Sequence, residues 1–232
     1  MSKSFGNCRI CRKPDCRKKK FSGKKFLITA GPTREFLDPV RFLSNPSSGK
    51  MGIYIADEAA KMGADVLLIH GPVDVPIPER VRKISITSAE DMYNAVMKNY
   101  NWSDCVIMSS AVADFTPTEK IKAKIKKNED ELLVRLKRTK DILAELGKNK
   151  GKKILVGFAL ETENLEENAR KKLHNKNLDM IVANLQSDRT GFRSDTNEVL
   201  ILHRNGTAKK IPLTSKRKIA REILKIIALE VI

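Results

Sequence analysis

The sequence predicts an α/β protein built on a Rossmann-like, doubly wound, mostly parallel sheet. From residue 25 onward, short β-branched runs alternate with amphipathic helical patterns, which is the element order of that fold class. A stretch near the middle of the chain changes to a period of two, which predicts an inserted β-ribbon. The dipeptide Asn205-Gly206 between two alternating runs predicts a hairpin near the C-terminus.

The predicted elements follow one another as that fold requires. A buried strand at 26–30 leads through a long loop to a helix from about Ser48 to Met62. The alternation continues with strands near 65–69, 82–86, 105–109, 154–158 and 180–183, and with helices near 89–99, 140–146 and 165–175. The hairpin strands are expected at 198–203 and 208–213, before a final helix that begins at Thr214 or Ser215.

The stretch from Phe115 to Thr139 carries the change of period. Lysines at 120, 122, 124 and 126 alternate with apolar residues at 121, 123 and 125, and a second alternation follows a turn at 127–130. This pattern predicts a two-stranded ribbon with one apolar and one cationic face. Such a cationic face could bind a triphosphate, or it could simply be a solvent-exposed surface.

Length and charge set the domain organisation. The chain has 232 residues and 41% hydrophobic content, enough for one large domain, which we expect at 25–232. Residues 1–25 carry ten Lys or Arg side chains and one acidic side chain, so about half of the net charge of +17 lies there. We therefore expect residues 1–24 to be a basic, flexible tail. No apolar run or leader pattern indicates a membrane span or secretion, so the expected compartment is the cytoplasm.

Three of the four cysteines lie in that tail. Cys8, Cys11 and Cys16 form a C-x2-C-x4-C pattern, for which a structural zinc site would need a fourth ligand that no nearby Cys or His supplies. Reduced thiols or a zinc ion shared across an oligomer remain open, and no metal site is assigned to one chain. Cys105 is expected in a buried strand.

Polar residues that follow strands are the candidate site residues, because ligands of doubly wound sheets bind beyond the carboxyl ends of the strands. The segment 31–52 leads through Ser47-Ser48-Gly49 to a helix N-terminus, where open amides suit an anion, although ordinary helix capping would use the same residues. The segment 109–115 offers small residues and Asp114, which is either a ligand contact or a turn former.

Two further observations limit the chemistry. Lys172 and Lys176 lie at i and i+4 on one helix face, for contact with a ligand or with solvent. No G-x-S-x-G, H-E-x-x-H, Walker A, G-x-G-x-x-G or kinase pattern occurs, so covalent and zinc-dependent hydrolytic catalysis have no support. Amides, lysines and isolated carboxylates suit phosphoryl or nucleotidyl transfer, in which positioning and charge stabilisation dominate.

Taken in order, these segments resemble the phosphopantothenate–cysteine ligase family from about Lys25 to the C-terminus. The matching stretches are GPTREFLDPVR, SNPSSGKMG, AVADF, KIKK at 124–127, GFALET and GF-x-S-D-x-N at 191–197. Bacterial members often carry the ligase behind a flavin-dependent decarboxylase, and this sequence has no match to that half. One departure is Thr139-Lys140, where the family often has Asn-Pro.

The resemblance implies a two-step reaction and a set of site residues. The implied partners are 4'-phosphopantothenate, L-cysteine, CTP and Mg²⁺, the product of the first step is an acyl-cytidylate, and the assembly is a homodimer. The implied catalytic residues are Asn45 and Lys124. The implied nucleotide contacts are Met108, Ser109, Ser110, Asp114, Lys124, Lys140, Asp141, Ile142, Leu143, Phe158, Lys172 and Lys176. The implied substrate contacts are Arg41 (from the neighbouring subunit), Asn45, Gly49, Ser110, Ala111 and Asp114.

Two other functional classes deserve comparison. The net charge of +17 suggests a non-catalytic nucleic-acid-binding protein, but aromatic content of 5% leaves few stacking platforms and the charge is concentrated in the tail. A dinucleotide-dependent oxidoreductase is disfavoured because the glycine fingerprint is missing.

Overall fold

The computed structural model describes residues 19–126, 132–161, 163–185 and 194–231. Twelve strands and five helices are assigned in these ranges. The strands are β1 (Lys25–Ala30), β2 (Arg34–Phe36), β3 (Phe42–Ser44), β4 (Asp65–His70), β5 (Arg82–Ser85), β6 (Cys105–Met108), β7 (Phe115–Pro117), β8 (Leu136–Arg138), β9 (Ile154–Glu161), β10 (Met180–Leu185), β11 (Thr196–His203) and β12 (Ala208–Ser215). The helices are α1 (Lys50–Lys61), α2 (Ala89–Tyr100), α3 (Ile142–Lys148), α4 (Leu165–Asn175) and α5 (Lys216–Val231).

An eight-stranded sheet forms the centre of the molecule, in the order β12-β11-β10-β9-β6-β1-β4-β5. The six strands from β10 to β5 in this order pair in parallel, and β11 and β12 join antiparallel at one edge. The chain moves outward from β1 in one direction to β4 and β5, and in the other to β6, β9 and β10. The predicted doubly wound fold and the C-terminal hairpin are therefore confirmed.

Helices cover both faces of the sheet and create two apolar layers. On one face, α1 and α5 pack over buried side chains such as Ile28, Ile55 and Ile223. On the other face, α2, α3 and α4 pack over side chains such as Leu27 and Leu155. Successive residues of β1, Leu27 and Ile28, thus serve opposite layers, as strand geometry requires. Cys105 in β6 is fully buried, as expected.

The folded part of the chain begins earlier than the predicted boundary at residue 25. Phe21 is fully buried, its ring lies 4.7 Å from that of Phe26, and its backbone amide donates to the Met62 carbonyl at 3.0 Å. Residues 19–24 therefore belong to the domain, and a count of basic residues could not reveal that one aromatic side chain anchors them. The tail residues 1–18, including Cys8, Cys11 and Cys16, lie outside the described residues.

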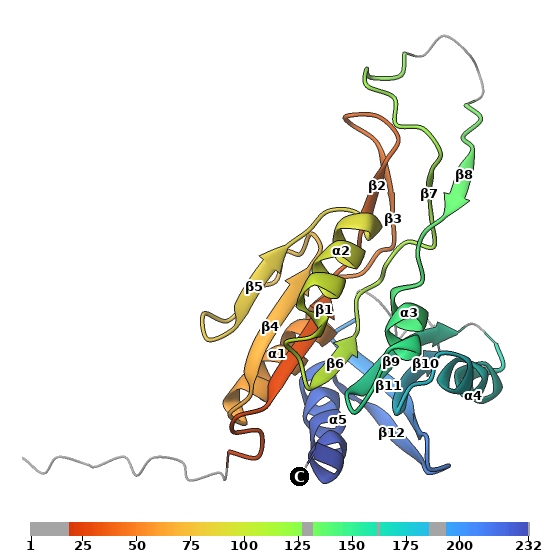
Figure 1. The fold of residues 1–232 in the computed structure, drawn as a ribbon. Helices are drawn as coiled ribbons and strands as arrows, with labels where there is room; N and C mark the ends of the chain where they lie inside the picture. Colours follow the sequence, from red (N-terminus) through yellow and green to blue (C-terminus); the bar gives the residue numbers. More distant parts are fainter. Residues whose placement is uncertain (1–18, 127–131, 162, 186–193, 232) are drawn as a thin grey trace, which may run out of the picture.

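A long arm projects from the body and departs from the sequence prediction (Figure 1). We define the arm as the β2–β3 hairpin together with residues 115–126 and 132–138. The predicted ribbon pairs at β7 and β8, nearer the body, whereas residues 120–126 are irregular, and 127–131 lie outside the described residues. The ribbon prediction was wrong in its position because residues 121–126 hydrogen-bond to the 37–41 loop: the Ile121 amide donates to the Leu37 carbonyl at 3.0 Å.

Other differences concern element ends. The first helix begins at Lys50 rather than Ser48, because Gly49 adopts a left-handed conformation with φ of 73°. The third helix begins at Ile142 rather than Lys140, because the Asp141 side chain caps it by accepting from the Ala144 amide at 3.0 Å. The strand predicted at 154–158 extends to Glu161. None of the described helices is long and apolar enough to cross a bilayer.

Candidate functional site

A pocket of about 720 Å³ lies at the carboxyl ends of β6, β9 and β10, beside the N-terminus of α1. This is where ligands bind in doubly wound sheets. The residues that the sequence analysis selected and that line this pocket are Asn45, Gly49, Met108, Ser109, Ser110, Ala111, Asp114, Lys140, Asp141, Ile142, Leu143, Phe158, Lys172 and Lys176. Two selected residues, Arg41 and Lys124, lie on the arm and outside this lining.

One wall of the pocket is the turn into α1, and it depends on two glycines. Gly49 has a positive φ, and a Cβ atom there would lie 2.5 Å from the Val73 side chain. At Gly52, a Cβ atom would lie 2.6 Å from the Thr29 carbonyl oxygen and 2.5 Å from Ser109 Oγ. The absence of side chains therefore lets α1 approach β1 closely and brings its first turn to the pocket.

The opposite wall is the segment that follows β6, and the chain after β1 holds it in place. The Ala111 amide donates to the Gly31 carbonyl at 2.9 Å, and the Ala113 amide donates to Thr33 Oγ1 at 3.0 Å. Thr29 Oγ1 donates to Ser110 Oγ at 2.9 Å. Because these contacts fix the backbone, the small side chains of the segment present a firm surface to a ligand.

Asn45 connects the two walls. Its side-chain nitrogen donates to the carbonyls of Ala111 at 3.3 Å and Val112 at 3.2 Å. The side chain is half-buried, and the turn at Ser47 follows directly, with the Ser47 amide donating to the Asn45 carbonyl at 2.8 Å. The amide group is therefore held in one orientation at the edge of the pocket.

The far end of the pocket combines apolar side chains with charged pairs. Ile142, Leu143 and Phe158 line it, and a flat heterocyclic ring would fit such a lining. Lys176 Nζ lies 2.8 Å from Asp141 Oδ2, and Lys172 Nζ lies 2.7 Å from Glu161 Oε1.

The pKa of Asp141 reflects these contacts. Burial would raise this pKa, but the hydrogen bonds from Lys176 and from the Ala144 amide outweigh burial and lower it. Asp141 therefore remains an anion and a hydrogen-bond acceptor at neutral pH. It could accept a hydrogen bond from the amino group of a nucleotide base.

Lys140 lines the pocket, yet its ammonium group has partners on α2. Nζ lies 2.9 Å from Glu90 Oε1 and 4.3 Å from the centre of the Tyr93 ring. The hydrogen bond with Glu90 raises the pKa of Lys140. The ammonium group of Lys140 is therefore held at α2 by Glu90 and Tyr93 in this arrangement.

Arg41 and Lys124 lie together on the arm rather than in the pocket of their own chain. Arg41 Nη1 donates to the Ile125 carbonyl at 3.3 Å, and the Ile125 amide donates to Asp38 Oδ2 at 3.1 Å. Asp38 also accepts from the amides of Val40 and Arg41, each at 2.7 Å, and pairs with the Arg41 guanidinium. Asp38 is therefore the common partner of Arg41 and of the backbone at Ile125, the residue that follows Lys124.

The sequence analysis missed several lining residues, notably Lys50, Asn184, Asn197 and Lys216. Asn184 lies in β10 just beyond the strand predicted at 180–183, so the strand-end rule could have found it. Asn197 belongs to the matched motif at 191–197, whose residues 191–193 lie outside the described ranges. Lys216 is the first residue of the last helix, and no local pattern indicates that it reaches the pocket.

The carboxylates that line the pocket are too few to coordinate a metal ion by themselves, so phosphate oxygens of a bound ligand would supply most of the coordination. Among the described residues, no group of three or more Cys, His, Asp or Glu side chains could hold a metal ion. Asp114 is a carboxylate on the strand-end wall, where Mg²⁺ could bind between it and nucleotide phosphates.

Comparison with known proteins places the chain in a defined group. The profile of the family described as DNA/pantothenate metabolism flavoprotein C-terminal domain matches residues 21–230. The coenzyme A biosynthesis bifunctional protein CoaBC of Bacillus subtilis (strain 168) is 50% identical over 208 residues, which cover 89% of this chain and 51% of that protein. The CoaBC of Haemophilus influenzae is 43% identical over 209 residues, which cover 90% of this chain and 52% of that protein. The chain thus spans about half the length of these relatives.

A solved structure agrees over nearly the whole domain. The crystal structure of a C-terminal domain of CoaBC superposes with a TM-score of 0.79 at 42% identity, covering 92% of this chain and 98% of that one. A Cab2 variant in complex with phosphopantothenate-cysteine shares the fold, with a TM-score of 0.74 at 17% identity, covering 89% of this chain and 87% of that one.

Proposed function

This chain belongs to the family of DNA/pantothenate metabolism flavoprotein C-terminal domains, and on that premise we propose that it joins 4'-phosphopantothenate to L-cysteine, with CTP as cosubstrate. The observation that carries the proposal is the pocket, whose lining unites almost all the residues that the ligase resemblance selects. The family match and the CoaBC relatives support a role in coenzyme A biosynthesis. They give no support to a nucleic-acid-binding protein. The cytoplasm is the compartment that we propose.

The reaction has two displacement steps. In the first, a carboxylate oxygen of phosphopantothenate attacks the α-phosphorus of CTP, and the bond to the β-phosphate breaks as pyrophosphate leaves. In the second, the cysteine nitrogen attacks the acyl carbon, the bond to the nucleotide oxygen breaks, and CMP leaves while the nitrogen loses a proton. Both steps need positioning and charge stabilisation rather than an enzyme nucleophile.

The pocket residues supply these requirements. The apolar end with Asp141 would hold the cytosine base, and the turn at Gly49 would offer amides to phosphate oxygens. Lys124 would neutralise the charge that develops at the α-phosphate, and Asn45 would hold the acyl group of the mixed anhydride. Mg²⁺, bound to the phosphates near Asp114, would reduce the repulsion between the attacking carboxylate and the nucleotide.

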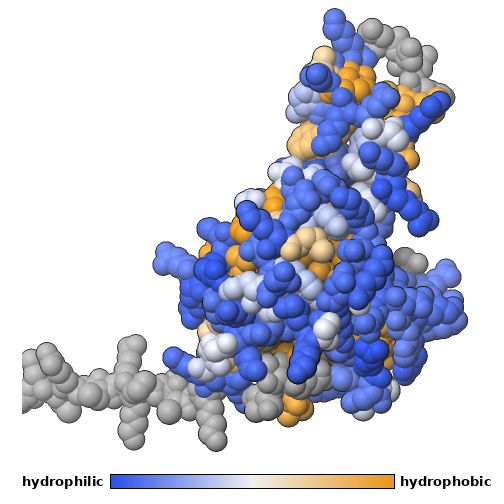
Figure 2. All heavy atoms as spheres, in the orientation of Figure 1, coloured by the Kyte–Doolittle hydropathy of each residue, from blue (hydrophilic) through white to orange (hydrophobic). Residues whose placement is uncertain are grey.

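A second copy of the chain is the expected source of the residues missing from each pocket. Among the described residues, nearly all the exposed large hydrophobic side chains lie on the arm: Val40, Phe42, Leu43, Phe115, Ile121, Leu132, Leu133, Val134 and Leu136. Figure 2 shows this apolar surface on the projecting arm, above a mostly hydrophilic body. An exposed apolar patch of this kind is typical of a protein interface. We propose a homodimer in which each arm brings Arg41 and Lys124 to the partner's pocket.

The activity is tested directly with purified protein, Mg²⁺, phosphopantothenate and cysteine. We expect pyrophosphate release with CTP and a lower rate with ATP. Absence of pyrophosphate release with CTP, ATP, GTP and UTP alike would refute the ligase proposal.

The two assigned catalytic roles predict different kinetic defects. Lys124→Gln should slow formation of the acyl-nucleotide by about 100-fold, the cost of one charge-stabilising group. Asn45→Asp should still release pyrophosphate in a single turnover, but the intermediate should accumulate because the second step is slow. Rapid-quench analysis of labelled CTP measures both steps. Equal slowing of the two steps in both variants would contradict the roles.

A further inference from the structure

A buried threonine of the central sheet makes its side-chain hydrogen bonds with the wall of the pocket. Thr29 lies in β1, between β4 and β6, and is fully buried. Its hydroxyl group contacts Ser110 and, more distantly, the Met108 thioether at 3.8 Å. Both of these residues line the pocket. Burial of a hydroxyl group costs free energy unless its hydrogen bonds are made, so these contacts compensate the burial of Thr29.

The Thr29 hydroxyl group gives its proton to Ser110. Thr29 Oγ1 accepts from the Ser110 amide at 3.2 Å and donates to Ser110 Oγ at 2.9 Å. A hydroxyl group has a single proton, and the Met108 sulfur is a weaker and more distant acceptor for it. Ser110 therefore retains its own hydroxyl proton, which no protein group within the described residues accepts. Because Ser110 is half-buried in the lining of the pocket, a ligand oxygen is the available acceptor.

Ser109, the preceding residue, has the opposite arrangement. Ser109 Oγ donates its proton to the Thr29 carbonyl at 2.8 Å. The same oxygen lies close to α1, since a Cβ atom at Gly52 would lie 2.5 Å from it. With its proton engaged, Ser109 can only accept a hydrogen bond from a ligand, whereas Ser110 can donate one. Thr29 thus gives two adjacent serines opposite hydrogen-bonding character, through its carbonyl and its hydroxyl group.

We propose that Thr29 is a positioning residue that fixes the Ser110 hydroxyl group as a hydrogen-bond donor to an anionic oxygen of the bound ligand. The inference rests on the proposed function for its ligands, which offer two oxygens of this kind. They are a phosphate oxygen of the nucleotide and the carboxylate of the phosphorylated acid. A hydrogen bond to an anion is stronger than one to a neutral group. A hydroxyl group that is already held in the donating orientation also loses less freedom when the ligand binds.

Calorimetric binding to Ser110→Ala tests the donated hydrogen bond without requiring turnover. The probes are CTP, cytidine and phosphopantothenate. If a nucleotide phosphate accepts the bond, affinity for CTP should fall by about 10- to 100-fold while affinity for cytidine is unchanged, as expected for the loss of one bond to a charged group. If the carboxylate of the acid accepts it, phosphopantothenate should lose that affinity instead. Unchanged affinity for all three probes, or a loss for cytidine as large as that for CTP, would overturn the proposal.

A double-mutant cycle measures whether Thr29 acts through Ser110. Thr29→Val removes the hydroxyl group but keeps the shape, and should weaken binding of the same probe by about 3- to 10-fold through loss of the fixed orientation. In the Ser110→Ala background it should have no further effect. Thr29→Ser keeps the hydroxyl group and should retain most of the affinity. An equal loss from Thr29→Val in both backgrounds would mean that Thr29 supports only the fold, and would overturn the proposal.

Thr33 supplies the matched control on the same wall. It is also fully buried, and its Oγ1 accepts from the Ala113 amide at 3.0 Å, so Thr33→Val likewise deprives a wall amide of its acceptor. Any loss of affinity in Thr33→Val should be the same with and without the Ser110 hydroxyl group. Coupling to Ser110 as large as that of Thr29→Val would contradict the positioning role.

Two further measurements keep the outcomes distinct. If Thr29→Val does not fold, Thr29→Cys, whose thiol donates only weakly, should show the same selective loss to a smaller extent and the same dependence on Ser110. If the wild-type protein binds CTP and phosphopantothenate but releases no pyrophosphate, the proposed function fails, whereas the binding cycle still decides the role of Thr29.

Discussion

At the scale of single residues, Asp38 connects two segments of the arm through its carboxylate. Burial would raise its pKa, but the amides of Arg41, Val40 and Ile125 and the Arg41 guanidinium outweigh burial and hold the pKa well below its ordinary range. The carboxylate is therefore ionised at neutral pH, and it accepts hydrogen bonds from two segments of the arm, the loop at 37–41 and residues 120–126. This makes Asp38 a positioning residue for Arg41 and for the backbone beside Lys124.

Asp38→Asn should therefore weaken catalysis without removing any group that contacts substrate. An amide of the same shape has only one acceptor oxygen, so the Arg41 side chain and residues 124–126 lose part of their support. We expect kcat/KM for phosphopantothenate to fall about tenfold, mainly through a slower first step, as is typical for loss of orientation. Steady-state and rapid-quench kinetics measure this effect.

The control for this variant lies on the same arm. Glu119 is exposed and carries the same type of charge, so Glu119→Gln should leave both steps unchanged. A defect in Asp38→Asn that appears wholly in the second step, or an equal defect in Glu119→Gln, would contradict the positioning role.

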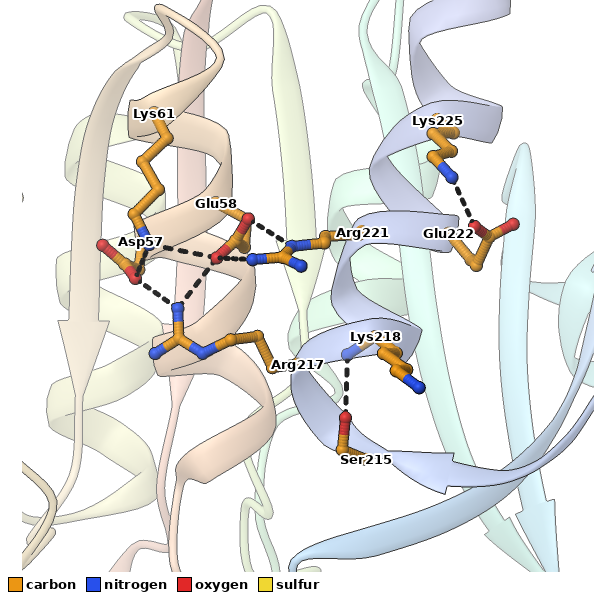
Figure 3. Close-up of polar contacts among 9 residues, drawn as sticks. All are labelled: Asp57, Glu58, Lys61, Ser215, Arg217, Lys218, Arg221, Glu222 and Lys225. Carbon is orange, nitrogen blue, oxygen red and sulfur yellow. Dashed lines mark hydrogen bonds and ion pairs between the residues drawn. The ribbon is translucent and has the colours of Figure 1, made fainter. Parts of the chain in front are cut away.

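At the scale of elements, the contact between α1 and α5 combines apolar packing with buried charge. Asp57 and Glu58 are the acidic members, and Lys61, Arg217 and Arg221 are the basic members (Figure 3). Burial would raise the pKa of Glu58, but hydrogen bonds from Arg221, Lys61 and Arg217 lower it to about 2. Since the ordinary value is 4.5, the folded protein binds the proton of Glu58 more weakly than the unfolded chain does.

This difference predicts a specific pH dependence of stability. The stabilisation from Glu58 is fully present above its unfolded pKa of about 4.5 and is lost as the pH falls toward about 2. Glu58→Gln should reduce the free energy of unfolding at pH 7 by roughly 2–3 kcal/mol, a value reduced from the full shift because the arginines are partly exposed. Urea unfolding between pH 2.5 and 7 should show the difference from wild type narrowing below pH 4.5.

The matched comparison is an ion pair at the surface. Glu145 pairs with Lys148 at 3.0 Å within α3, where the Lys148 side chain is largely exposed and the Glu145 side chain is partly exposed. Glu145→Gln should change the free energy of unfolding by less than about 1 kcal/mol, with little dependence on pH. A constant difference between Glu58→Gln and wild type across the pH range would exclude titration of Glu58 as the cause.

At the scale of the whole molecule, the arm is the feature on which the proposed homodimer depends. The arm extends away from the body, and its predicted catalytic and substrate-binding cations are absent from the lining of the pocket in the same chain. The apolar side chains on the arm supply a reason for association. A homodimer would satisfy both features through one symmetric exchange of arms.

Mixing two inactive variants tests this arrangement. If Lys124 acts in the partner's pocket, refolding Lys124→Gln together with Asn45→Asp should restore about one quarter of wild-type activity. The reason is that half of the randomly assorted dimers contain both variants, and one of their two pockets has an intact Asn45 and receives an intact Lys124. If each chain uses its own Lys124, every pocket carries a defect and no activity returns.

Association itself is measured by analytical ultracentrifugation. Phe42→Ser combined with Leu133→Ser should shift the protein toward the monomer, because both apolar side chains are exposed on the arm. A wild-type protein that sediments as a monomer at micromolar concentration would refute the exchange of arms.

Local sequence patterns were sufficient to predict the central sheet, its helices and many of the residues that line the pocket. Short β-branched runs and capped helices are local signals, and the strand-end rule turned residues such as Ser110 and Asp114 into site residues. The family resemblance added the apolar end of the pocket, including Asp141. The predictions of strands, helices and strand-end residues depend on neighbours in the sequence or on one topological rule, so the amino-acid sequence is sufficient to make them.

Tertiary contacts were needed to place the arm strands and to bring Lys216 to the lining of the pocket. Alternating lysines at 120–126 predicted a strand there, but hydrogen bonds to Leu37, Arg41 and Asp38, more than 80 residues earlier, hold part of that segment in an irregular path. Lys216 reaches the pocket because Arg217 and Arg221 pair with α1, some 160 residues earlier. Such contacts depend on distance in space, which local periodicity does not encode.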